Sequence, residues 1–108
     1  MSGKINRITL FKLPNSEDVE TAIAAFTEMQ SSSLKDGKPY ILSLEVKKLH
    51  NDPRSQGYTL ISKSSFASLE EMKFYDDHDE AHKKVKSIVG PKIDRPAEGG
   101  VLTLYMDA

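Results

Sequence analysis

Strand-like and helix-like hydrophobic patterns follow one another along this chain in an order that constrains the fold. Residues 5–13, 39–49, 58–66 and 101–106 form four strand-like segments, the second of them alternating between apolar and polar side chains. Two helix-like segments lie between them, and the first has apolar residues every three or four positions, at Val19, Ala22, Ile23, Phe26 and Met29. The order strand, helix, strand, strand, helix, strand predicts a ferredoxin-like α+β fold, an antiparallel sheet with the helices on one face.

Local capping signals predict where the helices begin. Asn15 precedes the first helical stripe, and Ser68 opens a capping box before the second. The acidic run 76–80 interrupts the second stripe, where Leu69, Met72 and Tyr75 are expected to face inward, and is interpreted as a solvated turn. Within that run Asp79 is suited to begin a further helix, so the second helix is expected to be broken, with a loop over 93–100 before the last strand.

Length, charge and cysteine content exclude several classes of protein. A chain of 108 residues fits one domain, residues 1–108, with a single core. The formal net charge of −1 provides no basic field that would attract nucleic acid, and the lack of cysteine excludes disulfides and thiolate catalysis. Because no apolar run approaches membrane-spanning length and no signal-peptide pattern is present, we expect a cytoplasmic protein with no nucleic-acid or membrane partner.

The predicted fold leaves one face of the sheet without helices. The last strand is apolar at nearly every position, and Ile41 and Ile61 add apolar groups opposite the face expected for Leu42 and Leu44. Strands that are apolar on both faces are typically buried on both. We therefore expect a two-fold homodimer whose sheets meet face to face, and the alternative is a monomer with a moderately apolar exposed face.

Short motifs spread over almost the whole chain match a known family. They are Arg7–Leu13 in the first strand, Gly57–Thr59 at the start of the third, and Phe66–Met72, which is followed by Tyr75 and by Glu80–His82. With these motifs the chain resembles the stress-responsive dimeric A/B barrel (Dabb) family. The resemblance implies a small homodimer that forms an α+β barrel. Many members have no assigned reaction, whereas a cyclase-like branch closes linear polyketides by aldol condensation.

The resemblance also implies candidate site residues. In the cyclase-like branch a Tyr and a His carry the acid/base work, and Tyr75 and His82 stand in those places. A His in an apolar cavity stays neutral and can accept a proton, while a Tyr hydroxyl can donate to an enolate or alkoxide. Arg7 and Leu60 stand where histidines are found in the family, and with Phe26 they are the expected substrate-binding residues. Arg7 could hold a carboxylate if it points into the barrel.

The sequence leaves two main functions open. The first is a cofactor-independent lyase or cyclase acting on a hydrophobic, polyketide-like carbonyl compound, with Tyr75 and His82 as the acid/base pair. The second is a non-catalytic, stress-associated homodimer that binds a small apolar ligand. In that case His82 is a helix residue satisfied by a backbone carbonyl, and Tyr75 fills the core.

Metal and cofactor chemistry is disfavoured by the sequence. His78 and His82 are four residues apart and could share a helix face, but no clear third ligand follows them, so we expect no metal. A heme- or oxygen-dependent barrel is a third alternative, and the lack of any Trp and of a clear proximal His disfavours it. We therefore expect no cofactor.

Overall fold

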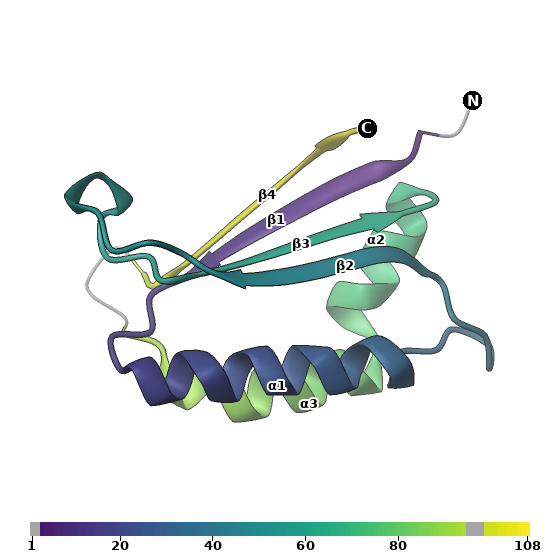
Figure 1. Ribbon diagram of the computed structural model, residues 1–108. Coiled ribbons are helices and arrows are strands. Elements are labelled where there is room, and N and C mark those ends of the chain that lie inside the picture. Colours follow the sequence, from purple (N-terminus) through teal and green to yellow (C-terminus); the bar gives the residue numbers. More distant parts are fainter. Residues whose placement is uncertain (1–2, 95–98) are drawn as a thin grey trace.

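The computed structural model describes residues 3–94 and 99–108, which form a four-stranded antiparallel sheet with helices on one face (Figure 1). Across the sheet the strands lie in the order β2-β3-β1-β4, with bounds β1 Ile5–Phe11, β2 Ile41–Lys48, β3 Leu60–Phe66 and β4 Val101–Asp107. The helices are α1 Ser16–Ser32, α2 Leu69–Asp77 and α3 Glu80–Val89, with short 3-10 turns η1 Pro53–Ser55 and η2 Gly90–Lys92. The predicted ferredoxin-like fold is confirmed.

The helices begin where the capping signals predict. Asn15 and Ser68 each accept a hydrogen bond from a backbone N–H in the first turn of the following helix. Asp79 caps α3 by accepting from the His82 N–H, and it also accepts from the Tyr40 hydroxyl. Within the described residues, no helix combines the length and the apolar character needed to cross a membrane. Of the predicted loop over 93–100, residues 95–98 lie outside the described residues.

The core lies between the sheet and the helices. In Figure 1, α1 and α3 lie side by side under the sheet, and α2 stands close to the end of β3. Leu69 is an exception to the predicted inward face of α2, since it is 39% exposed at the first position of that helix. The buried apolar side chains are Ile5, Leu13, Val19, Ala22, Phe26, Met29, Leu60, Phe66, Met72, Tyr75, Val85 and Val89.

The start of β2 departs from the predicted alternation. Ile41 pairs with Phe66, but the next pair in the ladder begins at Ser43, so Leu42 is the extra residue of a β-bulge. Ile41 therefore packs against the core, while Leu42 is 51% exposed. The prediction that Leu42 shares a face with Leu44 was wrong, because one extra residue moves the side chains before it to the opposite face.

The face of the sheet opposite the helices has an apolar half and a charged half. On the β1–β4 half, Leu10 pairs with Leu102, and the nearby Leu104 is exposed. On the β2–β3 half, Glu45 and Lys63 are cross-strand neighbours and form an ion pair, with 3.7 Å between Lys63 Nζ and Glu45 Oε1. β4 is also an edge strand, since it stands at one end of the strand order, next to β1. The apolar surface expected on this face is therefore present. It covers β1 and β4 and extends to Ile61 of β3, which pairs with Leu10, whereas Ile41, also expected on this face, packs against the core.

The buried cap at Asp79 gives a stability prediction. Asp79→Ala removes the cap of α3 and leaves the Tyr40 hydroxyl without its acceptor, so we expect the free energy of unfolding to fall by about 2 to 3 kcal/mol. Asn15→Ala removes an exposed cap with a single bond and should cost about 1 kcal/mol. Urea denaturation of both variants measures the difference, and equal losses would contradict the role assigned to Tyr40.

Candidate functional site

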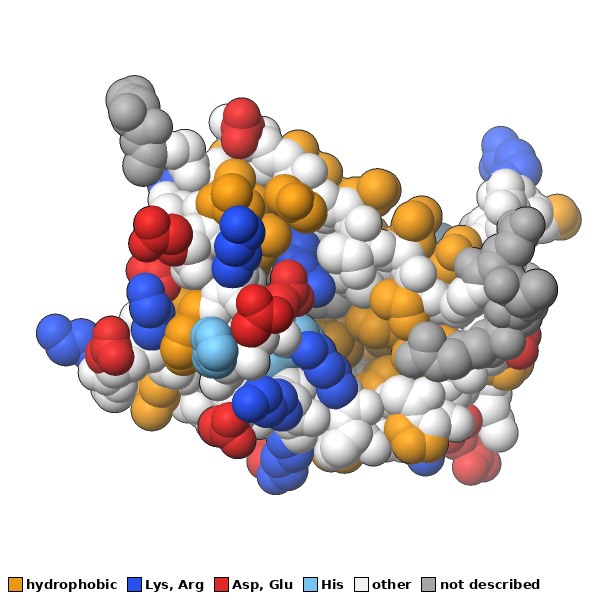
Figure 2. All heavy atoms as spheres, turned by 180° about the vertical axis from the view of Figure 1, so that it is seen from behind, with side chains coloured by type: hydrophobic (Ala, Val, Ile, Leu, Met, Phe, Trp, Pro, Cys, Tyr) orange, Lys and Arg blue, Asp and Glu red, His pale blue; other side chains and the backbone are white. Residues whose placement is uncertain are grey.

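A cavity of about 390 Å³ lies between the sheet and α3. Seen from behind, the molecule is hollowed, with hydrophobic side chains on the floor of the hollow and charged side chains along one rim (Figure 2). β1, β3 and β4 provide the sheet side of the cavity, and α1, α2 and α3 provide the opposite side. A volume of this order is typical of small-molecule sites.

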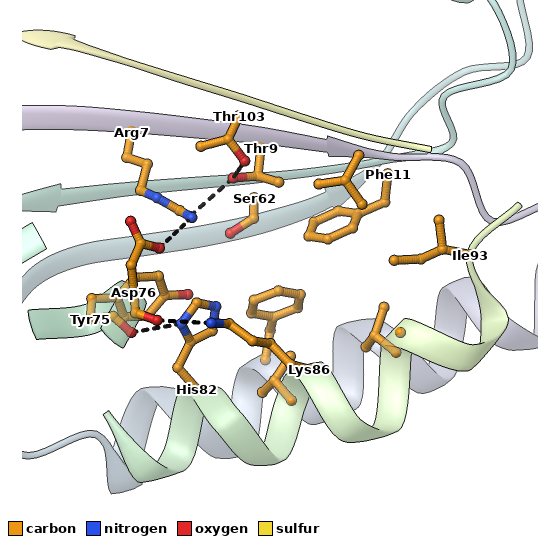
Figure 3. A pocket seen from close by; sticks show the side chains of 15 residues that line it. Arg7, Thr9, Phe11, Ser62, Tyr75, Asp76, His82, Lys86, Ile93 and Thr103 are labelled. Atoms are coloured by element: carbon orange, nitrogen blue, oxygen red, sulfur yellow. Dashed lines mark hydrogen bonds and ion pairs between the residues drawn. The ribbon is translucent and has the colours of Figure 1, made fainter. Parts of the chain in front are cut away.

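Four of the six described strand residues that line the cavity are polar. Arg7, Thr9, Ser62 and Thr103 point from the strands toward the helices (Figure 3). The hydroxyls of Thr9 and Thr103 lie 3.3 Å apart, and Ser62 Oγ is buried without a hydrogen-bond partner among the described residues. Buried polar groups normally have hydrogen-bond partners. Polar side chains at the alternate strand positions that face the helices therefore indicate a cavity rather than a closed core.

Arg7 places a buried positive charge at the polar end of the cavity. Its side chain is 9% exposed, and its Nη2 donates to Asp76 Oδ1 at 2.8 Å. Its Nη1 donates to Thr9 Oγ1 at 3.0 Å. Asp76 belongs to the last turn of α2, and its side chain is 35% exposed. This ion pair therefore joins β1, one of the two inner strands of the sheet, to the end of α2.

His82 projects from α3 toward the sheet (Figure 3). Its Nδ1 lies 2.8 Å from the backbone carbonyl oxygen of Tyr75. A carbonyl only accepts, so Nδ1 carries the proton and Nε2 keeps its lone pair. Burial lowers the pKa of His82 from its ordinary 6.5 to about 4, and the imidazole is therefore uncharged at pH 7.

Tyr75 and His82, the predicted pair, lie together. Their rings stack with centroids 3.7 Å apart and planes 10° apart, and the Arg7 guanidinium lies 5.1 Å from the Tyr75 ring centroid. The Tyr75 hydroxyl donates to Met29 Sδ, 3.8 Å away, and burial raises the pKa of this phenol. Tyr75 therefore presents its ring and its carbonyl to His82, while its hydroxyl contacts α1.

The break between α2 and α3 provides two hydrogen-bond acceptors at the site. The last carbonyls of a helix have no partners within the helix. In α2 the Tyr75 carbonyl accepts from His82 Nδ1, and the Asp76 carbonyl accepts from Lys86 Nζ at 2.9 Å. Both donors come from α3, so the end of one helix orients two side chains of the next.

The other predicted site residues lie in different surroundings. Phe26 lines the apolar part of the cavity, whereas Leu60 is fully buried in the core and is not among the described residues that line it. Sequence reasoning missed the polar residues Thr9, Ser62, Asp76, Lys86 and Thr103. A signal for the strand residues was present, since Arg7 and Thr9 are polar at alternate positions of a strand expected to face the core.

Residues 5–97 match the family model described as Stress responsive A/B Barrel Domain. The chain belongs to this family. The A/B barrel chain is 36% identical over 90 residues to a Fusaristatin A biosynthesis cluster protein of Gibberella zeae. The alignment covers 83% of this chain and 65% of the relative, so the chain spans just under two thirds of that protein's length.

Solved structures share the fold of this A/B barrel chain. The hydroxynitrile lyase of Passiflora edulis is similar with a TM-score of 0.76 and 11% identity, covering 100% of this chain and 95% of that one. A dimeric ferredoxin-like protein of unknown function from Thermobifida fusca has a TM-score of 0.76 and 14% identity, covering 100% and 93%. At these identities the likeness shows the fold, and the second of these neighbours is dimeric.

The buried His82 predicts a pH dependence of stability. The unfolded chain binds a proton at this residue near pH 6.5, whereas the folded A/B barrel chain does so only near pH 4. The free energy of unfolding therefore falls as pH drops from about 6.5 to 4, by up to roughly 3 kcal/mol from this group.

Denaturation at several pH values measures this dependence in the wild type, His82→Gln and His78→Gln. His82→Gln should show a shallower fall over this range. His78 is exposed, so its variant should keep the wild-type slope. Identical slopes in the wild type and His82→Gln would contradict the uncharged, buried state of His82.

Proposed function

We propose that this A/B barrel chain is a cofactor-independent enzyme of the lyase or cyclase type, acting on a hydrophobic carbonyl compound in the cavity. The observation that carries the proposal is the uncharged Nε2 of His82, whose ring is held in one orientation in a cavity that also contains the Arg7 guanidinium. Enolate chemistry needs a base to remove a proton and a positive charge to stabilise the oxyanion. The names of the Gibberella zeae relative and of the Passiflora edulis lyase also support small-molecule chemistry.

The proposed reaction is an intramolecular aldol addition. His82 Nε2 takes a proton from the carbon next to a carbonyl, and the C–H electron pair forms an enolate whose oxygen is stabilised by Arg7. The enolate carbon then attacks a second carbonyl of the same molecule, which closes a ring and produces an alkoxide. His82 returns its proton to that alkoxide. The reverse sequence breaks a carbon–carbon bond, and neither direction requires an oxidant or a reductant.

Tyr75 is a positioning residue in this proposal. Its carbonyl holds the Nδ1 proton of His82, and its ring stacks on the imidazole. The hydroxyl contacts Met29 Sδ and would have to leave that contact to donate a proton to substrate. The role of the Tyr75 hydroxyl as the general acid stays a prediction.

Hydrogen exchange at a simple ketone tests the proposal. The wild type should accelerate deuterium incorporation next to the carbonyl of 2-nonanone in D2O at pH 7.5, measured by NMR. His82→Gln should lower the catalysed rate about 100-fold, the scale of general-base catalysis. Tyr75→Phe should stay within a few-fold of the wild type, because it keeps the carbonyl and the ring. Equal rates for His82→Gln and the wild type would refute the role of His82.

A second candidate function is the non-catalytic binding of a small apolar ligand. The observation that favours it is the apolar part of the cavity, formed by Phe11, Phe26, Val85, Val89, Ile93 and Val101. Under this alternative 2-nonanone binds, and its exchange rate equals that of the protein-free solution. The same NMR samples therefore distinguish the two functions.

We also propose that the chain forms a homodimer through the face of the sheet opposite the helices, called the open face below. The apolar side chains of β1 and β4 on this face support it, because a two-fold contact would remove them from water. The dimeric state of the ferredoxin-like neighbour from Thermobifida fusca is consistent with such pairing.

A single substitution tests the proposed dimer. Leu104→Lys places a charge in the middle of the apolar half of the open face and should convert the dimer to a monomer, measured by sedimentation velocity. Leu34→Lys is the matched control, because Leu34 is equally exposed (46% against 47%) but lies outside the sheet. A wild-type monomer, or a dimer that survives Leu104→Lys, would contradict this interface.

A further inference from the structure

The charges around the cavity do not balance. Among the described residues that line it, Arg7 and Lys86 are cationic, only Asp76 is anionic, and burial keeps His82 uncharged at pH 7. One positive charge is therefore left over: Arg7 is buried and paired with Asp76, while Lys86 is exposed at the rim of the cavity. Around the buried Arg7, charges attract more strongly than in bulk water, because the surrounding protein is less polarisable than water. Such a cavity favours an anionic ligand over a neutral one.

Arg7 has hydrogen-bonding capacity to spare. A guanidinium has five N–H donors, and the described residues engage Nη1 with Thr9 and Nη2 with Asp76. The planar group matches a carboxylate, which it can hold with two parallel hydrogen bonds. Its present partner Asp76 is a carboxylate at the rim, with a side chain 35% exposed. A ligand carboxylate can therefore take the place of Asp76 while Asp76 turns toward water.

The rest of the cavity indicates what the anion is attached to. Near Arg7, the hydroxyls of Thr9, Ser62 and Thr103 offer hydrogen bonds to oxygen atoms (Figure 3), and Ser62 Oγ has no partner among the described residues. The opposite part is apolar and includes Phe11, Phe26 and Val89. A ligand that fills both parts has an oxygen-bearing, charged end and a hydrocarbon end.

We infer that the cavity binds a monocarboxylic acid with an apolar chain, its carboxylate held by Arg7 and Lys86 in competition with Asp76. This inference rests on the cavity of the proposed function and names the class of molecule that enters it, a carbonyl compound that also carries a free carboxylate. The carboxylate takes the place of Asp76 on Arg7 and leaves the other N–H groups of the guanidinium for the oxyanion. The competition makes Asp76 the residue that sets the affinity.

A bound carboxylate also changes the proton affinity of His82. The charged groups that act on His82 are Arg7 and Lys86, which lower its pKa, and Asp79, which raises it, with Asp76 on the cavity wall. A further negative charge in the cavity stabilises the imidazolium form. The acid end of the ligand therefore makes His82 a stronger base at the moment when a base is required.

Calorimetric titration with octanoate and with 1-octanol tests the inference, because the two probes have the same chain length and differ in charge. Wild-type protein at pH 7.5 should bind octanoate at least ten-fold more tightly than 1-octanol. Asp76→Asn removes the competing carboxylate and should tighten octanoate binding several-fold without changing that of 1-octanol. Lys86→Gln should weaken octanoate binding several-fold. Arg54→Gln is the control, since Arg54 lies outside the cavity lining with a side chain 91% exposed.

The substitutions are made at Asp76 and Lys86, because a substitution of the buried Arg7 is expected to destabilise the fold. The inference is overturned if octanoate binds no more tightly than 1-octanol, or if Asp76→Asn weakens octanoate binding in a folded protein. Failure of the proposed function is a separate result. If binding is charge-selective but ketone exchange does not depend on His82, this inference stands and the proposed reaction is refuted. If ketone exchange depends on His82 but binding is not charge-selective, the proposed reaction stands and this inference is refuted.

Discussion

The buried guanidinium of Arg7 is the constraint on which the arrangement of the site depends. A charged group can remain inside a protein only when it is paired and hydrogen-bonded, and Asp76 and Thr9 meet that need. The pair requires that the end of α2 stay beside β1, and that the strand positions around it be polar. The cavity lies where this ion pair bridges the sheet and the end of α2. An apolar residue at position 7 would favour a closed core.

Much of the fold could be predicted because its signals are local. Asn15, Ser68 and Asp79 begin their helices through bonds to nearby backbone groups, and such bonds depend on the neighbouring sequence alone. The position of Leu42 could not be predicted in this way. A β-bulge is a mismatch in the pairing of two strands, β2 and β3, that are separated in the sequence. The residues of β2 by themselves show an uninterrupted alternation and do not indicate the mismatch.

Only part of the candidate site could be predicted from the sequence. The family motifs led to Tyr75 and His82, which the structure brings into ring contact, but they do not encode the direction of the Tyr75 hydroxyl. Asp76 was interpreted as part of a solvated turn, because an acidic run is typical of one. Its role appears only when folding brings Arg7, sixty-nine residues away, within 2.8 Å. An ion pair between residues this far apart produces no repeating pattern in a single sequence from which it could be predicted.

The break between α2 and α3 has a consequence for how the site tolerates changes in chain length. Tyr75 and Asp76 offer their carbonyls from one helix, and His82 and Lys86 meet them from the next. Inserting or deleting one residue in the non-helical link at 78–79 would displace α3 relative to the end of α2, because consecutive Cα atoms lie about 3.8 Å apart, and both contacts would be lost together. Exchanging one side chain for another on the exposed faces of these helices leaves that geometry intact. Variants of this chain should therefore tolerate a change in the composition of this region better than a change in its length.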